Sequence, residues 1–322
     1  MCREILSEFS SHPGEEALLQ TYFGIAIVIY LCLGAAGAGL AGVAAFFYLN
    51  SRARFLSAIK VSIWSSLVFL IVGLGFLFVD LGRPLQALNI FNFSNFGSWA
   101  TRGFWLLLTS MIVYALLLIV VSMTSSRFIA LRWGFYKNIR EALATILSWA
   151  TIILSFCLAF YTGMLLYECL GIPFWGTLLL PILFLSSSTN IGLCLFLWIN
   201  ALSPSQFAVT RSRRMSVTTR VAVILLLVEA IVLTLYLVWA SESNIEAVVQ
   251  SFNHLVFGEL TLLFWLCVVL SGYIIPAFTL LLGSSLLGQR QAKVFTTITM
   301  VGLAIGLVAL RYGILFSGII QY

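Results

Sequence analysis

The sequence is poor in charged and metal-binding residues, and this excludes several classes of protein. Only 9% of its 322 residues are charged, whereas a soluble domain carries about 25%. The two histidines, His12 and His254, lie outside the long apolar runs, so no histidine pair can hold a haem within a membrane. No C-x-x-C pair and no cluster of cysteine, histidine and carboxylate residues has the spacing of a metal site. We therefore expect no haem and no metal in this chain.

Nucleotide-binding and hydrolytic motifs are also missing. The sequence has no P-loop, no dinucleotide-binding glycine pattern and no Ser–His–Asp arrangement. The net charge of +6 does not indicate nucleic-acid binding, because basic residues of membrane proteins collect in cytoplasmic loops. We expect no nucleic-acid partner.

Long apolar runs take up most of the chain, which is 61% hydrophobic. A transmembrane helix needs about 20 apolar residues. Eight runs reach that length: 22–49, 57–79, 103–124, 142–167, 174–200, 219–240, 255–283 and 294–317. We predict an all-α integral membrane protein with eight transmembrane helices in one membrane domain, residues 1–322. Its two four-helix bundles would comprise helices 1–4 (22–167) and helices 5–8 (174–317).

The lysine and arginine residues predict the orientation. Thirteen of the seventeen lie in or beside the connections between helices 1 and 2, 3 and 4, 5 and 6, and 7 and 8. Because basic residues collect in cytoplasmic loops, we expect both termini on the outer, periplasmic face of the cytoplasmic membrane.

Residues 80–105, DLGRPLQALNIFNFSNFGSWATRGFW, combine an acid, two arginines and many aromatic residues in one connection on the predicted outer side. A bilayer rejects the charges of Asp80, Arg83 and Arg102 unless they are paired or hydrated. The aromatic residues around them suit a membrane–water interface. We expect this stretch to form an amphipathic lid over a site.

Polar residues of other helices are predicted near the same face. Tyr161 falls in the outer third of helix 4, Glu259 about one turn inside helix 7, and Arg311 in the outer part of helix 8. Glu229 is the exception, near the middle of helix 6. Ionisable residues inside a membrane often line a cavity and mark function, although a snorkelling side chain or a structural ion pair is the alternative. Glu229 and Arg311 are candidates for a proton path.

A pocket with aromatic walls and with carboxylate, arginine and tyrosine groups suits a lipophilic molecule with a polar head. A quinone fits this description, because its ring packs between apolar side chains. Its two oxygens need hydrogen-bond donors and a proton acceptor.

Several motifs, in order along the chain, resemble those of one family. They are D-L-G-R-P at 80–84, N-x-x-x-F-G-S-W-x-x-R-G at 92–103, YTGMLL in helix 4 and FWLCVVLSGYIIP in helix 7. The family is NrfD/PsrC, the membrane subunit of polysulfide reductase-type enzymes. The resemblance implies an eight-helix subunit that binds menaquinone or a similar quinone near the outer face. It also implies an iron–sulfur partner subunit, which exchanges electrons with a molybdopterin catalytic subunit.

The resemblance also implies roles for individual residues. Tyr161 matches the tyrosine expected at the quinone head. The first-helix histidine of some members has no clear counterpart, and Gln20 and Tyr22 are the local candidates. The expected quinone-binding residues are Tyr161, Gln20, Tyr22, Arg83, Arg102 and Trp99. Asp80 or Glu259 is expected to accept a proton.

Two other functions stay open. A secondary transporter is compatible with charged residues inside the membrane, although most of the charges lie near one face rather than at the midplane. The second alternative is a purely structural anchor for a periplasmic enzyme.

Overall fold

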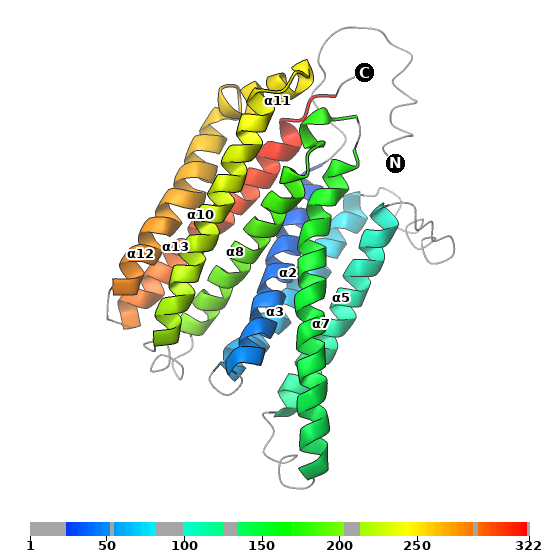
Figure 1. The fold of residues 1–322 in the computed structure, drawn as a ribbon, viewed down its shortest axis with the longest axis vertical. Coiled ribbons are helices and arrows are strands. Elements are labelled where there is room, and N and C mark those ends of the chain that lie inside the picture. The colour runs from blue at the N-terminus through cyan, green and yellow to red at the C-terminus, as the bar shows by residue number, and fades with distance from the viewer. Residues whose placement is uncertain are drawn as a thin grey trace.

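The computed structural model describes residues 24–51, 55–80, 99–124, 134–169, 171–202, 213–285 and 289–320. Its elements, in chain order, are α2 (Ile25–Ser51), α3 (Leu56–Asp80), α5 (Trp99–Thr124), α7 (Gly134–Tyr167), η2 (Pro173–Trp175), α8 (Leu179–Leu202), α10 (Arg213–Ser241), α11 (Glu246–Val256), η4 (Leu263–Ile274), α12 (Ile275–Ser285) and α13 (Gln289–Phe316) (Figure 1). Within this part of the chain, 8 spans are long and apolar enough to cross a membrane, and η4 with α12 makes the seventh. The prediction of an all-α membrane protein with eight transmembrane helices is confirmed.

The outward faces of the helices are apolar, as lipid requires. On α10, Ile224, Leu227 and Ile231 are 58%, 57% and 59% exposed, whereas Leu226 and Glu229 point inward and are buried. Every backbone polar group in a bilayer must find its partner within the protein, and a helix satisfies all of them locally. A helix with large apolar side chains on its outer face is therefore stable in lipid.

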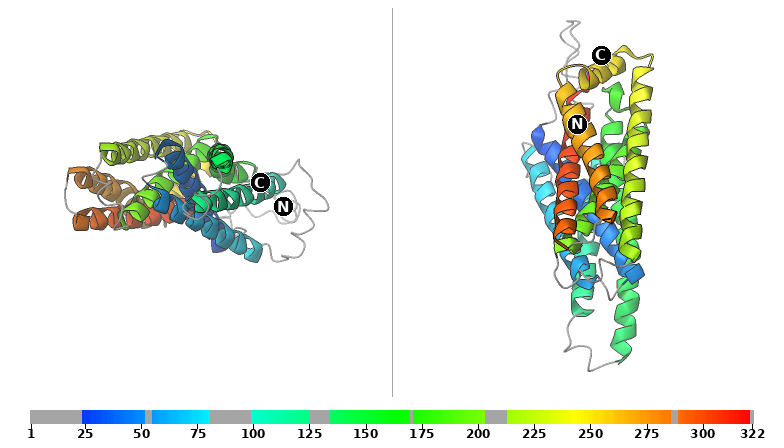
Figure 2. Two further views of the ribbon diagram at one scale, coloured as in Figure 1. Left: turned by 90° about the horizontal axis from the view of Figure 1, so that it is seen from below. Right: turned by 90° about the vertical axis from the view of Figure 1, so that its left-hand side faces the viewer.

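The spans run alternately in opposite directions, so the beginning of α2 and the end of α13 lie at the same end of the bundle (Figure 1). Helix α11 lies across this end, which we call the α11 end (Figure 2). The opposite end carries the connections rich in lysine and arginine, and we call it the basic end. The assignment of the α11 end to the periplasm rests on the charge count.

Helices α2 and α8 occupy the middle of the bundle. Helices α3, α5 and α7 lie to one side of them, and α10, α12 and α13 lie to the other (Figures 1 and 2). The backbones of α2 and α8 touch where they cross, because a Cβ on Gly39 would overlap the Ser188 carbonyl and one on Gly192 would overlap the Gly39 backbone. Small residues allow this close approach between membrane helices.

The seventh span begins later than the sequence indicated. Residues 255 and 256 belong to α11, which buries Ala247, Val248, Ser251 and Leu255 on one face. A turn follows, and the span starts at Leu263. Its first 12 residues, Leu263–Ile274, are π-helical. Pro276 follows closely, and a proline inside a helix removes one hydrogen bond and disturbs the regular turn.

Candidate functional site

Tyr161 lies inside the bundle near the α11 end. It belongs to the last two turns of α7 and is 6% exposed. Its ring packs directly on Gly103 of α5, where an added Cβ would overlap the phenol group. The glycine therefore allows the two helices to approach and fixes the position of the Tyr161 hydroxyl.

Tyr30 of α2 is a second phenol at this place. It is 4% exposed and lies in the second turn of α2, at the same end of the bundle as Tyr161. Its ring lies beside Gly73 of α3, where an added Cβ would be 3.7 Å away. Four helices thus meet at Tyr30 and Tyr161, which we call the tyrosine pair.

The hydroxyls of the tyrosine pair have no hydrogen-bond partner among the residues that the structure describes. Other buried tyrosines differ: the Tyr114 hydroxyl is 2.6 Å from Ser155 Oγ, and the Tyr236 hydroxyl donates to the Phe174 carbonyl at 2.9 Å. Buried hydroxyls normally find a partner. The pair therefore offers two donors to a molecule bound at this place.

The other residues predicted at this site are placed less completely. Gln20, Tyr22 and Arg83 lie outside the described residues. Asp80 is the last residue of α3 and Trp99 the first of α5, so both backbones reach the α11 end, and their side chains lie outside the description. Arg102 is exposed, one residue before the glycine that packs on Tyr161.

The expectation that Glu259 lies one turn inside the seventh span is wrong. Glu259 lies in the turn between α11 and η4, before the span begins, and its side chain is 87% exposed. Its carboxylate is 3.8 Å from His254 Nε2. The physical reason is that α11 and the turn after it carry the chain past Glu259 before the span begins at Leu263.

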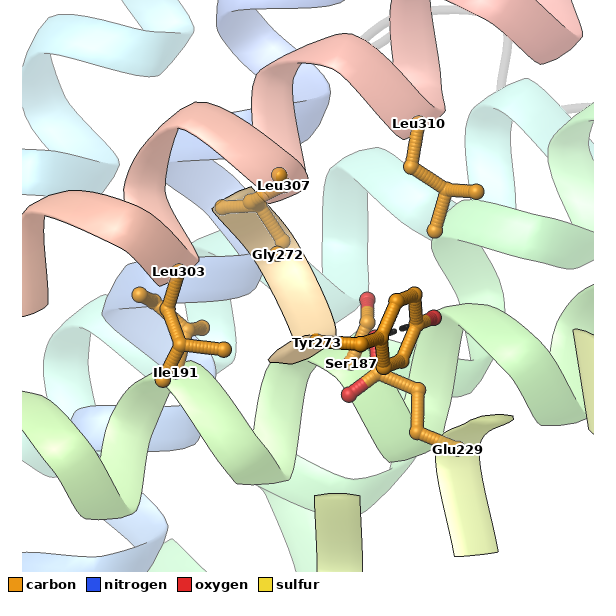
Figure 3. Close-up of a pocket in the computed structure, with 9 residues that line it drawn as sticks. Ser187, Ile191, Glu229, Gly272, Tyr273, Leu303, Leu307 and Leu310 are labelled. Atoms are coloured by element: carbon orange, nitrogen blue, oxygen red, sulfur yellow. Dashed lines mark hydrogen bonds between the residues drawn. The ribbon is translucent and has the colours of Figure 1, made fainter. Parts of the chain in front are cut away.

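A second group of polar residues surrounds Glu229, which is 6% exposed in α10. Asn190 Nδ2 of α8 donates a hydrogen bond to Glu229 Oε2 at 2.8 Å, and the Tyr273 hydroxyl of η4 donates to Oε1 at 3.3 Å. Figure 3 shows the Tyr273 ring lying beside the carboxylate. The sequence left Glu229 alone at mid-depth, whereas the structure gives it partners from two other helices.

Arg311 of α13 is connected to this group. It is 1% exposed, donates from Nη2 to Ser187 Oγ at 3.2 Å, and lies over the Phe184 ring at 4.7 Å. Its Nε and Nη1 have no hydrogen-bond partner within the described part of the chain. Ser187 and Glu229 line the same cavity of about 10 Å³ (Figure 3). One water molecule needs about that volume.

Sequence reasoning missed Tyr30, Asn190, Tyr273 and Ser187. Tyr30 has no distinguishing local pattern, since it is one aromatic residue in an apolar helix. Asn190 and Ser187 belong to the run SSSTN at 186–190, a polar interruption of an apolar span that could have indicated an internal site.

The chain matches the family model described as Polysulphide reductase, NrfD over residues 15–322. The chain belongs to the NrfD family. The C subunit of the polysulfide reductase of Wolinella succinogenes is 28% identical to it over 250 residues, which are 76% of this chain and 77% of that protein. The resemblance inferred from the D-L-G-R-P element and the motifs that follow it is confirmed. This NrfD protein carries both the tyrosine pair and the Glu229–Arg311 group within the matched residues.

The two groups of this NrfD protein consist of hydroxyl, amide, guanidinium and carboxylate side chains. No group of three or more histidine, cysteine or carboxylate residues gathers among the described residues. The tyrosine pair supplies two hydroxyl donors near the α11 end, and Glu229 supplies a carboxylate deeper in the bundle. The two groups occupy different sets of helices.

Proposed function

We propose that this chain is the quinone-binding membrane subunit of a respiratory oxidoreductase complex in the cytoplasmic membrane. It exchanges electrons between menaquinol, or a similar quinol, and an iron–sulfur partner subunit. That partner serves a molybdopterin catalytic subunit. Family membership supports this proposal, and so does the name of the Wolinella relative, which describes one subunit of a polysulfide reductase.

The tyrosine pair is the observation that carries the proposal. Neither hydroxyl has a hydrogen-bond partner among the described residues, so both can donate to a bound molecule. A quinone presents two oxygens and an apolar ring, and the two tyrosine rings pack beside Gly103 and Gly73, which leave room for no further polar side chain. The residues present therefore fit the group, with Tyr161 and Tyr30 as its hydrogen-bond donors.

When bound, the quinol supplies two electrons and two protons. Tyr161 and Tyr30 would orient the ring by donating hydrogen bonds to its oxygens. The close packing of the Tyr161 ring on Gly103 would keep that hydroxyl in position. Asp80, at the end of α3, is the proposed proton acceptor. Arg83 and Arg102 are close to it in the sequence, and a positive charge nearby favours the ionised form of a carboxylate. Gln20, Tyr22 and Trp99 remain proposed contacts of the quinone.

We assign Glu259 a role other than contact with the quinone. Because its carboxylate is exposed beside His254, it suits proton release at the surface rather than contact with the quinone. A bound quinol would pass its electrons to the partner subunit, which we place at the α11 end. No metal within this chain is needed for that transfer.

Coupling to proton movement is a second function, favoured by the Glu229–Arg311 group. Glu229 is a buried carboxylate with two donors, next to a cavity of about the size of one water. An ionisable residue in such a place is typical of proton paths in membranes. Neither a secondary transporter nor a purely structural anchor requires two hydroxyl donors at the tyrosine pair.

The test is quinol-dependent turnover of the assembled complex. Replacing Tyr161→Phe or Tyr30→Phe removes one donor, and we expect quinol turnover to fall while activity with a soluble electron donor is unchanged. Tyr236→Phe is the matched control, because it removes a buried hydroxyl whose partner is the Phe174 carbonyl. Unchanged quinol turnover in both Tyr161→Phe and Tyr30→Phe would refute the proposal.

A further inference from the structure

A large groove lies between the two halves of the bundle, away from both polar groups described above. Helices α2 and α7 form one wall, and α8 and α10 form the other. Its volume is about 550 Å³, within the range of roughly 300–1,000 Å³ that is typical of small-molecule sites. Gly39 and Gly42 of α2 are among its lining residues.

The deep part of the groove is suited to hydrocarbon. Fifteen of its twenty lining residues are apolar or glycine. The other five are polar, and the three in the deep part have partners. Ser155 Oγ is 2.6 Å from the Tyr114 hydroxyl, Ser188 donates to the Ala35 carbonyl at 2.7 Å, and Thr189 donates within its own helix at 2.9 Å. A hydrocarbon chain can therefore occupy this part without burying an unsatisfied polar group.

The groove opens toward lipid and has a polar end. Phe46, Phe156 and Val221 line it and are 55%, 59% and 42% exposed on the lipid-facing surface. The remaining two polar lining residues, Asn50 and Thr218, lie at the basic end, where α2 ends and α10 begins. This polarity gradient matches an amphiphile whose chain lies inside the groove and whose head lies at the basic end.

The first two turns of α10, at that end, contain three arginines. Arg220 is exposed on α10, two residues after Thr218, and Arg213 and Arg214 form the first residues of the same helix. Basic residues at the end of membrane helices attract anionic lipid head groups, by about 1 kcal/mol for each lysine or arginine near the surface. A head group with a net negative charge gains more from these charges than a neutral quinone head does.

We propose that this groove is a binding site for an anionic phospholipid. One acyl chain lies between α2, α7, α8 and α10, and the phosphate lies at the basic end beside Arg220. The site is separate from the tyrosine pair, which lies toward the α11 end. The bound lipid fills the space between the two halves of the bundle.

The test uses the purified full-length protein, stripped of lipid in mild detergent and titrated with phosphatidylglycerol or phosphatidylcholine of equal acyl length, with binding read by native mass spectrometry. We expect phosphatidylglycerol to bind more tightly. Val221→Trp fills part of the groove and should weaken that binding roughly tenfold, the effect of excluding about two methylene groups. Ile231→Trp is the matched control, since Ile231 is exposed on the same helix, further from the basic end, and does not line the groove.

The charge is tested separately. Arg220→Gln should weaken phosphatidylglycerol binding about fivefold and phosphatidylcholine binding less, because the choline cation offsets the phosphate charge, whereas Lys293→Gln, on α13, should change neither. Equal affinity for the two lipids in the wild type would overturn the proposal. So would full binding by a folded Val221→Trp variant, or recovery of a quinone from the groove. If Val221→Trp does not fold, the Arg220→Gln and Lys293→Gln pair decides.

Discussion

Gly103 gives the sharpest test of the tyrosine pair, because its lack of a side chain fixes the position of Tyr161. A methyl group at position 103 would overlap the phenol. The Gly103→Ala variant must therefore move the ring by roughly 1–2 Å to restore an ordinary van der Waals separation. Overpacking of this kind costs about 1–3 kcal/mol, which a folded protein can tolerate. The displacement matters more for function, because a misplacement of about 1 Å can lower a rate about a hundredfold.

We expect Gly103→Ala to lower quinol-dependent turnover of the assembled complex by one to two orders of magnitude, with activity from a soluble donor unchanged. Gly75→Ala is the matched control, since an added Cβ at Gly75 on α3 meets nothing within 4 Å. The Gly103→Ala/Tyr161→Phe double variant should be little worse than either single variant, because both act through one hydroxyl. Wild-type turnover in Gly103→Ala, or additive losses in the double variant, would refute the placement of Tyr161 at the quinone.

Three further predictions concern other parts of the bundle. Glu229→Gln keeps an acceptor in place, so we expect folding to change by less than about 1 kcal/mol. Proteoliposomes should lose only the proton release that exceeds the two protons of each quinol, and an unchanged excess would remove Glu229 from the proton path. Glu259→Gln should change quinol turnover less than twofold, since the side chain is exposed outside the span; a tenfold loss would return Glu259 to the quinone site. Gly192→Val should lower the melting temperature in detergent, because its side chain would collide with the Gly39 backbone where α2 and α8 cross, while Gly34→Ala, which meets nothing within 4 Å, should not.

Hydropathy located the spans well because a bilayer imposes a simple length and polarity on each of them. It failed at the seventh span for a physical reason. The apolar face of α11 runs into the turn and the span, and Glu259 is the only charged residue in residues 255–283, so the composition alone shows no boundary. Only the amphipathic spacing of α11 separates a helix on the surface from one inside the membrane.

The contacts of the site were less accessible to sequence reasoning. Asn190 and Tyr273 are 39 and 44 residues from Glu229, and no local pattern brings them together. Tyr30 reaches Tyr161 only because four helices converge at the α11 end. By contrast, Tyr161 itself could be selected from the sequence, because its YTG motif resembles that of the NrfD family.

The most direct measurement of the central claim is the position of the bound quinone. An azido-menaquinone analogue, photolysed in the assembled complex and mapped by mass spectrometry, should label the peptides that carry Tyr30, Gly103 or Tyr161. Excess unlabelled menaquinone should prevent that labelling, and Tyr161→Phe should weaken it. Specific labelling confined to α10, α12 or α13, around Glu229, would contradict the account.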